Sequence, residues 1–592
     1  MCLGGVLPGT RMVTAALTAA LIASHFVDPV RGLRAHPAGW LFIPFLAYAA
    51  ANVAWVTPVR WLGWSDWLNW TQAVAVFWVV LNGIEAPACR RFIGGLLVAV
   101  GLVASALALY QHSVKPDWIM LGRTQAAQFI GRSSGPFGIP NSLGALMALL
   151  IPPVGFLAVG RGRPASQRIL WALVFFALGV GFVLAISRGA WVSLAAALGL
   201  RLMFAPGRSL GQRFAASAAA VGAGALIAAG LYYSYPMMHV RIEQFRADAG
   251  ERTRPIMWRG AIKIFEAHPV LGGGGGSYDT LFEPFRPDGY IDRPVYAHCD
   301  YLNTLADFGA VGFVLFFGAA GTVAWRCARA GGLAGAAFTG LLAFSLHLLV
   351  DFDLKIPALA MISATIAALA TREAWPGATR PSAPPGSGIG PARGAALCTA
   401  AAAVAFTGLW AVPMYRAEAF RYAAREKINK MALARVDESR EGNAIALIVA
   451  DMERAVALDP ANAQAWSDKA YAESLLALSQ TARTAELGVD VARDANRAIA
   501  LCPLLPEFWI RRGTGYDMQL RWLEGGDSYV QALKLAPLGA ASWYYQGYHL
   551  SLAPNQVGPA MAAVEISLRL DPGFLLAQSL RQRLAIRLQQ HP

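Results

Sequence analysis

Long apolar runs recur along the first 412 residues of this chain. They cover residues 12–27, 38–56, 70–84, 92–110, 142–159, 169–186, 189–204, 214–233, 302–325, 333–350, 354–371 and 395–412. A helix needs about 20 apolar residues to cross a bilayer, where its backbone groups must be hydrogen-bonded within the segment. We therefore expect an all-α fold, a polytopic membrane helical bundle with about 12 spans.

Composition supports this class and bears on the partners. Hydrophobic residues make up 56% of the 592 residues and charged residues only 15%, against roughly 25% in soluble domains. The net charge of +14 could indicate nucleic acid, but the arginines lie in short loops between apolar runs and form no recognition motif. We therefore predict a membrane, and no nucleic acid, as the partner.

The arginines also predict the orientation of the chain. Residues such as Arg90, Arg91 and Arg168 occupy every second loop, and short basic loops stay in the cytoplasm. The long polar loop Ser234–Tyr301, and everything after Val412, are then expected on the outward side.

The sequence predicts neither a cofactor nor a metal. The six cysteines are scattered without a CxxC pair, which supports neither a zinc site nor a disulfide framework. No Asp-x-Asp or His/carboxylate cluster indicates a metal. The glycines Gly272–Gly276 follow no strand and precede no Gly-Lys-Ser/Thr, so a flexible turn is a simpler interpretation than a nucleotide loop.

Composition also divides the chain into four parts. Residues 1–371 form the predicted transmembrane domain, whose large loop covers 234–301. Residues 372–394 form a Pro/Gly-rich connector, residues 395–412 an additional transmembrane helix, and residues 413–592 a repeat domain.

A recurring pattern marks the repeat domain. A proline precedes a tryptophan by six residues at Pro460/Trp466, Pro503/Trp509 and Pro537/Trp543. These prolines and Pro572 lie 43, 34 and 35 residues apart, close to the tetratricopeptide period of about 34. We predict an α-solenoid of tetratricopeptide-like repeats that binds a protein partner, with an ordinary helical bundle as the alternative.

Polar residues near the ends of predicted spans, and one arginine in the long polar loop, are the candidates for chemistry. They are Arg188 in LAISRGAW, Arg254 in RTRPIMW, His298 in YAHCDYL, and Arg132 and Asn141 in GRSSGPFGIPNS. Charged residues at membrane depth are costly and therefore default to functional candidates. Taken singly, Arg188 could instead be a boundary arginine that extends to the headgroups, and His298 could be structural.

The order of these stretches carries more information than any one of them. Gly-x-Phe-x-x-Pro-Asn precedes a span and is followed by Ser187-Arg188-Gly189, Arg254–Trp258, His268–Gly274 and His298–Leu302. Over roughly residues 11–371, this order closely resembles the O-antigen ligase and polymerase superfamily of bacterial membrane glycosyltransferases. The sequence departs from the family at Cys299, usually asparagine, and at Asp307, often glutamate. The C-terminal repeats are not part of the ligase core.

The resemblance implies a bacterial inner (cytoplasmic) membrane protein with its active-site loop and repeats in the periplasm. Its donor would be an undecaprenyl-pyrophosphate-linked glycan, transferred to an acceptor lipid, glycan or protein. Direct attack would invert the anomeric centre, and because no metal-ligand motif is present in the sequence we expect transfer without a metal. His298 would be the general base, and Arg188, Arg254 and, as a further candidate, Arg132 would bind the pyrophosphate. The supporting residues would be Asp300, Tyr301, Asn141 and Gly274.

Other functions stay open. Within the same fold, the chain could be an O-antigen or exopolysaccharide polymerase or a protein O-oligosaccharyltransferase. Outside enzymes, it could be a membrane transporter or an accessory scaffold that uses its repeats. A transporter should carry ionisable residues at mid-span, whereas Asp351 and Asp353 lie at a span end, before Lys355.

Overall fold

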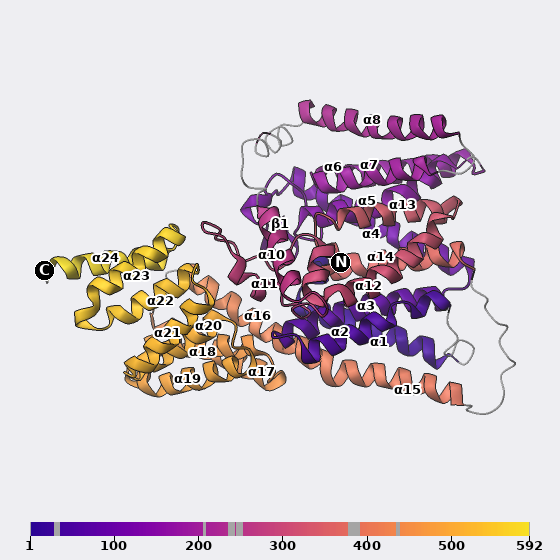
Figure 1. The fold of residues 1–592 in the computed structure, drawn as a ribbon. Coiled ribbons are helices and arrows are strands. Elements are labelled where there is room, and N and C mark those ends of the chain that lie inside the picture. Colours follow the sequence, from indigo (N-terminus) through magenta and orange to yellow (C-terminus); the bar gives the residue numbers. More distant parts are fainter. Residues whose placement is uncertain are drawn as a thin grey trace.

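The computed structural model describes residues 2–28, 36–160, 162–204, 209–234, 243, 253–376, 391–433 and 438–590. The predicted loop 234–301 and connector 372–394 therefore lie partly outside the described residues. The described chain is almost entirely helical, which confirms the all-α class, and its one sheet pairs the two-residue strands β1 (Trp118–Ile119) and β2 (Arg123–Thr124). Figure 1 shows an N-terminal helical part and a C-terminal part at one end of it.

The N-terminal part follows the predicted apolar runs. Its helices are α1 (Pro8–Val27), α2 (Ile43–Trp55), α3 (Arg60–Gly83), α4 (Pro87–Ser113), α5 (Pro140–Val159), α6 (Ala165–Leu184), α7 (Arg188–Met203), α8 (Leu210–Ser234), α10 (Thr253–Ala267), α11 (Tyr278–Leu281), α12 (Asp300–Ala328), α13 (Gly332–His347), α14 (Pro357–Ala374) and α15 (Pro391–Phe406). Each predicted run falls on one of these helices. Among the described residues, seven helices are long and apolar enough to cross a membrane, so the count of twelve spans stays a prediction.

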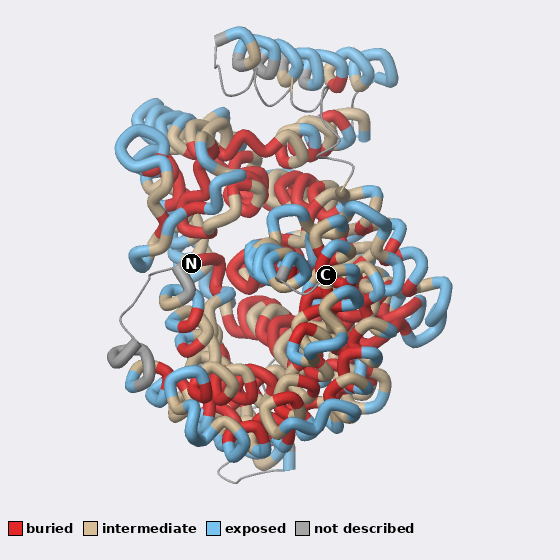
Figure 2. The backbone as a smooth tube through the Cα atoms, turned by 90° about the vertical axis from the view of Figure 1, so that its left-hand side faces the viewer, coloured by how far each residue is buried: buried red, intermediate tan, exposed pale blue. Residues whose placement is uncertain are grey.

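Apolar side chains cover the outside of several of these helices. Phe214 and Leu226 of α8 are 63% and 75% exposed, and Phe176 of α6 is 71% exposed. Figure 2 shows α8 at the top as a mostly exposed helix, above a buried interior. Such surfaces are unfavourable in water and suit contact with lipid, as expected for a membrane protein.

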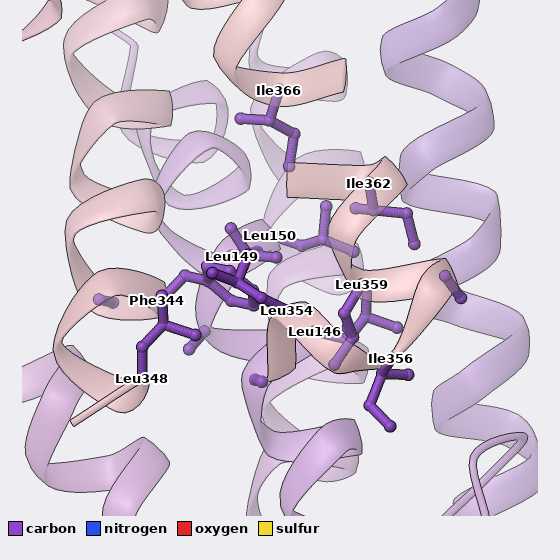
Figure 3. Packing of buried hydrophobic residues seen from close by; sticks show 14 of the residues in the cluster. Leu146, Leu149, Leu150, Phe344, Leu348, Leu354, Ile356, Leu359, Ile362 and Ile366 are labelled. Carbon is purple, nitrogen blue, oxygen red and sulfur yellow. The ribbon is translucent and has the colours of Figure 1, made fainter. Parts of the chain in front are cut away.

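Helix α5 lies in the interior of the N-terminal part. It begins at Pro140, whose fixed φ suits a first helical turn. Its Leu149 is fully buried and belongs to one cluster with Phe344 of α13 (Figure 3). Gly340 permits this packing, because a Cβ there would lie 2.2 Å from the Leu149 carbonyl oxygen. The packing fixes the relative positions of α5 and α13, which carry the polar residues Asn141 and His347 near one end of each helix.

The C-terminal part contains helices that pack on their neighbours in sequence. They are α16 (Val412–Leu433), α17 (Glu438–Leu458), α18 (Ala463–Ser479), α19 (Thr484–Leu501), α20 (Pro506–Met518), α21 (Trp522–Leu535), α22 (Ala540–Ser551), α23 (Val557–Leu570) and α24 (Leu575–Gln590). We call α17–α24 the C-terminal array. The tetratricopeptide assignment of this array stays a prediction.

One hydrogen bond explains the proline–tryptophan pattern of the array. The indole N–H groups of Trp466, Trp509 and Trp543 donate to the carbonyls of Pro460, Pro503 and Pro537 at 3.0, 2.8 and 2.8 Å. At the fourth position, Gln578 Nε2 donates to the Pro572 carbonyl at 2.7 Å. In each case, the side chain six residues after the proline closes the turn between two helices.

The array is attached to the N-terminal part in two ways. A π-helical segment, Thr407–Ala411, joins α15 to α16, so one continuous helix runs from residue 391 to 433 and includes the predicted boundary at 412/413. In addition, Val59 and Trp61 at the start of α3 pack in one buried cluster with Leu505 and Phe508 of the array. The Trp61 and Phe508 rings lie 6.4 Å apart.

Candidate active site

Three arginines from separate parts of the sequence line one cavity. Arg132 precedes α5, Arg188 begins α7 and Arg254 is the second residue of α10. With Asn141 and His347, they line a cavity of about 100 Å³. The structure thus brings together four residues that the sequence marked as candidates.

The cavity also lies at the N-termini of three helices. First-turn residues of α5, α7 and α10, namely Asn141, Arg188 and Arg254, line it. Ser187 caps α7, since its Oγ accepts a hydrogen bond from the Ala190 N–H at 3.4 Å. Backbone N–H groups and the helix dipole favour anions at helix N-termini. Three guanidinium groups and three such termini therefore suit the cavity to a phosphate-like anion.

A buried carboxylate connects the arginines. Arg132 Nη2 donates to Asn141 Oδ1 at 2.6 Å, and Asn141 Nδ2 donates to Asp351 Oδ2 at 2.6 Å. Arg254 Nη2 lies 3.7 Å from the same Asp351 oxygen. Asp351 follows α13, is only 2% exposed and also accepts a hydrogen bond from the Phe352 N–H at 3.0 Å. It therefore orients one arginine directly and another through Asn141.

His298 lies close to Oδ1, the other carboxylate oxygen of Asp351. Its Nδ1 is 3.6 Å from Asp351 Oδ1, and its ring meets Phe352 edge-on at 4.6 Å between centroids. The Trp258 indole donates to the His298 carbonyl at 3.3 Å, one helical turn after Arg254. The Nδ1 distance exceeds a hydrogen bond, and catalytic hydrogen bonds often tighten only with substrate bound. A carboxylate facing Nδ1 leaves Nε2 to accept a proton.

Charge around Asp351 decides its ionisation. Burial alone would raise the pKa of Asp351, but His298, His347 and Arg254 together hold that pKa below its ordinary value. Asp351 is therefore a permanent carboxylate at neutral pH. His347 is itself held by Asp353, with Nδ1 2.5 Å from Oδ2 and both side chains 1% exposed.

The comparison with protein families found a match in the central part of the chain. Residues 142–317 match the O-antigen ligase family. The match supports the O-antigen ligase superfamily and a membrane enzyme of glycosyltransferase type. It includes Arg188, Arg254 and His298, and it ends before Asp351. The comparison with curated proteins found no match.

Asp300 lies within the matched segment 142–317 and holds the chain around Asp351. Its N–H donates to the Leu348 carbonyl at 2.9 Å and to the Asp351 carbonyl at 3.2 Å. Its Oδ2 accepts a hydrogen bond from the Leu354 N–H at 2.9 Å. Tyr301, the next residue, instead donates from its hydroxyl to the Ser345 carbonyl at 3.0 Å and faces away from the arginine cavity into an apolar one.

Gly274 does not line the arginine cavity, and the glycine run around it is packed rather than open. The Gly273 and Gly274 N–H groups donate to the carbonyls of Ala306 and Asp307 at 2.8 and 2.9 Å. A Cβ on Gly274, whose φ is +105°, would lie 2.4 Å from the Thr57 Cα. The run is therefore a close contact between α12 and the turn before α3, and neither a flexible turn nor a phosphate cradle.

The sequence patterns placed Asp351, Asp353 and Lys355 at a span end but did not mark them, or His347 at the end of α13, as site residues. His347, Asp351, Asp353 and Lys355 fall within nine residues of mostly apolar sequence, and all four are buried. That density of ionisable groups near a span end was the available signal. Lys355 Nζ donates to Asp66 at 2.9 and 3.0 Å and joins α3 to the same segment. Among the described residues, no group of three or more His, Cys, Asp or Glu could hold a metal ion.

Proposed function

We propose that this protein transfers a glycan from an undecaprenyl-pyrophosphate donor to an acceptor hydroxyl, with inversion at the anomeric carbon and without a metal. The observation that carries the proposal is the convergence of Arg132, Arg188 and Arg254 on one cavity, beside a histidine on a buried carboxylate. The match to the O-antigen ligase family supports the same reaction class.

The arginines supply what a pyrophosphate leaving group needs. Guanidinium groups can bind phosphate oxygens bidentately. Preorganised cations lower a barrier most where charge develops in the transition state. Because Asn141 and Asp351 hold Arg132 and Arg254 in place, little reorganisation is needed when the leaving group departs.

The proposed step is a direct displacement. The acceptor oxygen attacks the anomeric carbon and forms the new glycosidic bond. The bond from that carbon to the pyrophosphate oxygen breaks, and the pyrophosphate leaves with the electron pair. His298 Nε2 takes the hydroxyl proton and releases it to water, while Asp351 stabilises the imidazolium.

A second cavity supports a lipid-linked donor. It measures about 380 Å³, and helices α3, α12, α13 and α14 line it with side chains such as Phe77 and Phe316. Tyr301 and Leu348 also line it, and Leu348 lies three residues before Asp351. We place the polyprenyl chain of the donor in this cavity, with its pyrophosphate in the neighbouring arginine cavity.

The arrangement in Figure 1 supports placing the active site and the C-terminal array on the same side of the membrane. The polar segment with α10 and α11 lies at the same end of the helices as the C-terminal array. We propose that both face the periplasm and that the helices lie in the bacterial inner membrane, where the donor lipid can enter from the side.

Single substitutions test the assigned roles. His298→Ala should lower turnover about 10²–10⁴-fold while the dissociation constant of undecaprenyl pyrophosphate stays the same. Arg188→Ala and Arg254→Ala should lower turnover and weaken that binding together, and lysine should restore either only in part. His268→Ala and Arg123→Ala are the matched controls, because neither residue lines the arginine cavity.

Turnover is measured with purified protein, lipid-linked oligosaccharide, and core lipid, glycan or peptide offered separately as acceptor. Near-normal turnover in folded His298→Ala would refute the general-base role. If wild-type protein binds the donor but leaves all three acceptors unmodified, the proposed glycosyl transfer is wrong.

A further inference from the structure

A cleft separates the polar segment after the glycine run from the C-terminal array. It measures about 290 Å³, at the lower end of small-ligand sites. Residues 279–293 line one side, and the N-terminal ends of α20 and α22 and the turn before α24 line the other. The packing of Trp61 against Phe508 fixes the array close to the N-terminal part.

On the loop side of the cleft, the charged side chains form ion pairs, but two of their buried polar atoms lack hydrogen-bond partners among the described residues. Arg293 Nη2 lies 3.3 Å from Asp279 Oδ2, and Arg286 forms an ion pair with Glu283. Glu283 Oε1 and Arg286 Nε are nevertheless buried with no hydrogen-bond partner among the described residues. Buried polar atoms without partners are costly and mark places where a ligand can bind.

The array side adds donors and acceptors. Glu507 and Asp571 line the cleft there, beside the first turns of α20 and α22. Within the described chain, neither of these two helices has a side-chain hydrogen bond at its N-cap. Backbone N–H groups at such termini can donate hydrogen bonds to a ligand oxygen.

The charges of the lining residues indicate which class of ligand the cleft can bind. Four carboxylates and two guanidinium groups line the cleft, so an anionic ligand would be repelled. Tyr290 and Phe574 supply aromatic faces among these polar groups. Paired carboxylate and guanidinium groups beside aromatic rings suit neighbouring neutral hydroxyls, because each hydroxyl can both donate and accept a hydrogen bond.

The cleft is also connected to the candidate active site. The Tyr278 hydroxyl donates to the Met257 carbonyl of α10 at 2.8 Å, three residues after Arg254. The Phe282 ring packs on Gly260 of the same helix, where a Cβ would lie 2.4 Å from it. Helix α10 therefore contacts the segment whose Asp279 and Glu283 line the cleft, while its Arg254 lines the arginine cavity, and His298 follows Arg293 by five residues.

We propose that this cleft binds a neutral glycan and presents its hydroxyl end to His298 as the acceptor. The proposal rests on the transfer reaction proposed above, because it names the acceptor class of that reaction. The array is then part of the acceptor site, and the ligand is held between the two parts of the chain.

Equilibrium binding tests this without the reaction. Full-length protein in lipid nanodiscs, with no donor present, is titrated with fluorescent neutral hexose oligosaccharides, with a phosphorylated oligosaccharide and with a lysine-rich peptide. Glu283→Gln on the loop and Glu507→Gln on the array should each weaken neutral-oligosaccharide binding about tenfold. Glu486→Gln is the matched control, because Glu486 forms the same (i,i+3) pair with an arginine on the exposed array surface.

The outcomes separate the two proposals. Weaker binding in both cleft variants but not in Glu486→Gln supports the acceptor site, even if the wild type transfers no glycan. No saturable binding of the neutral oligosaccharides, equal binding in all variants, or binding of only the phosphorylated or peptide probe would overturn it. Transfer by a protein that fails these binding tests would leave the proposed reaction standing and the acceptor site wrong.

Discussion

Alanine at Gly274 tests whether the glycine run is a packed contact. Gly274 has φ +105°, and an added Cβ would lie 2.4, 2.7 and 2.9 Å from the Cα, Oγ1 and N of Thr57. Two of these atoms are backbone, so no rotamer change relieves the overlap. The turn before α3 would have to move, together with Trp61, which packs against the array.

Two costs add in this variant. A side chain in the left-handed region costs about 1–2 kcal/mol, and overpacking of a tight contact costs about 1–3 kcal/mol. We expect Gly274→Ala to destabilise the protein by about 2–5 kcal/mol in total. Gly122→Ala isolates the first cost, because Gly122 has φ +69° and a Cβ added there would have no described heavy atom within 4 Å.

The measurement is unfolding in detergent, followed by the fluorescence of the 18 tryptophans. Gly274→Ala should unfold at a clearly lower temperature or denaturant concentration than Gly122→Ala, which should itself lie only slightly below wild type. Equal unfolding of the two variants would show that the run tolerates a Cβ, and the flexible-turn interpretation would return.

Two further predictions concern buried charge. Lys355→Met should destabilise the protein by about 3–5 kcal/mol, because it removes the buried cation shared by the carboxylates of Asp66 and Asp307. Asp66→Asn in the same chain should recover part of the loss, and no recovery in thermal unfolding would contradict this. In the array, Glu473 shares the Lys469 ammonium with Asp494, and burial raises the pKa of Glu473 to about 7. The folded array binds this proton more tightly than the unfolded chain, so its stability should fall as the pH rises from 5 to 8. Glu473→Gln should remove that slope in pH-dependent melting curves, and an unchanged slope would assign it to other groups.

Features that depend on short spacing could be predicted from the sequence. Apolar runs gave the helices because length and hydropathy are local properties. The Pro460/Trp466 spacing marked the inter-helix turns because the hydrogen bond that closes each turn spans only six residues. Arg188 could be selected because a charge near a span end is costly wherever it occurs, and Arg254, inside the polar loop, because of its place in the order of motifs.

Features that depend on contacts between residues far apart in the sequence could not be predicted. Asp351 matters because Asn141, Arg254 and His298 meet on it, and these lie on separate elements of the chain. Glycine is compatible with a mobile turn and with a tight contact alike, and only the positions of Thr57 and Asp307 distinguish the two for Gly274. The cleft likewise needs the array to be docked before Glu283 and Glu507 face one space.

The continuous helix from residue 391 to 433 constrains how this protein can change in length. One residue added to an α-helix rotates everything beyond it by about 100°. A single insertion in α15 would therefore turn the array away from Trp61, whereas seven residues, close to two full turns, would nearly restore its direction. The π-helical Thr407–Ala411 segment, whose Val412 N–H donates to the Thr407 carbonyl in an i→i+5 hydrogen bond, already gives this helix a phase different from that of an uninterrupted α-helix. The rotational phase of this helix, rather than its length alone, sets whether the array meets the rest of the chain.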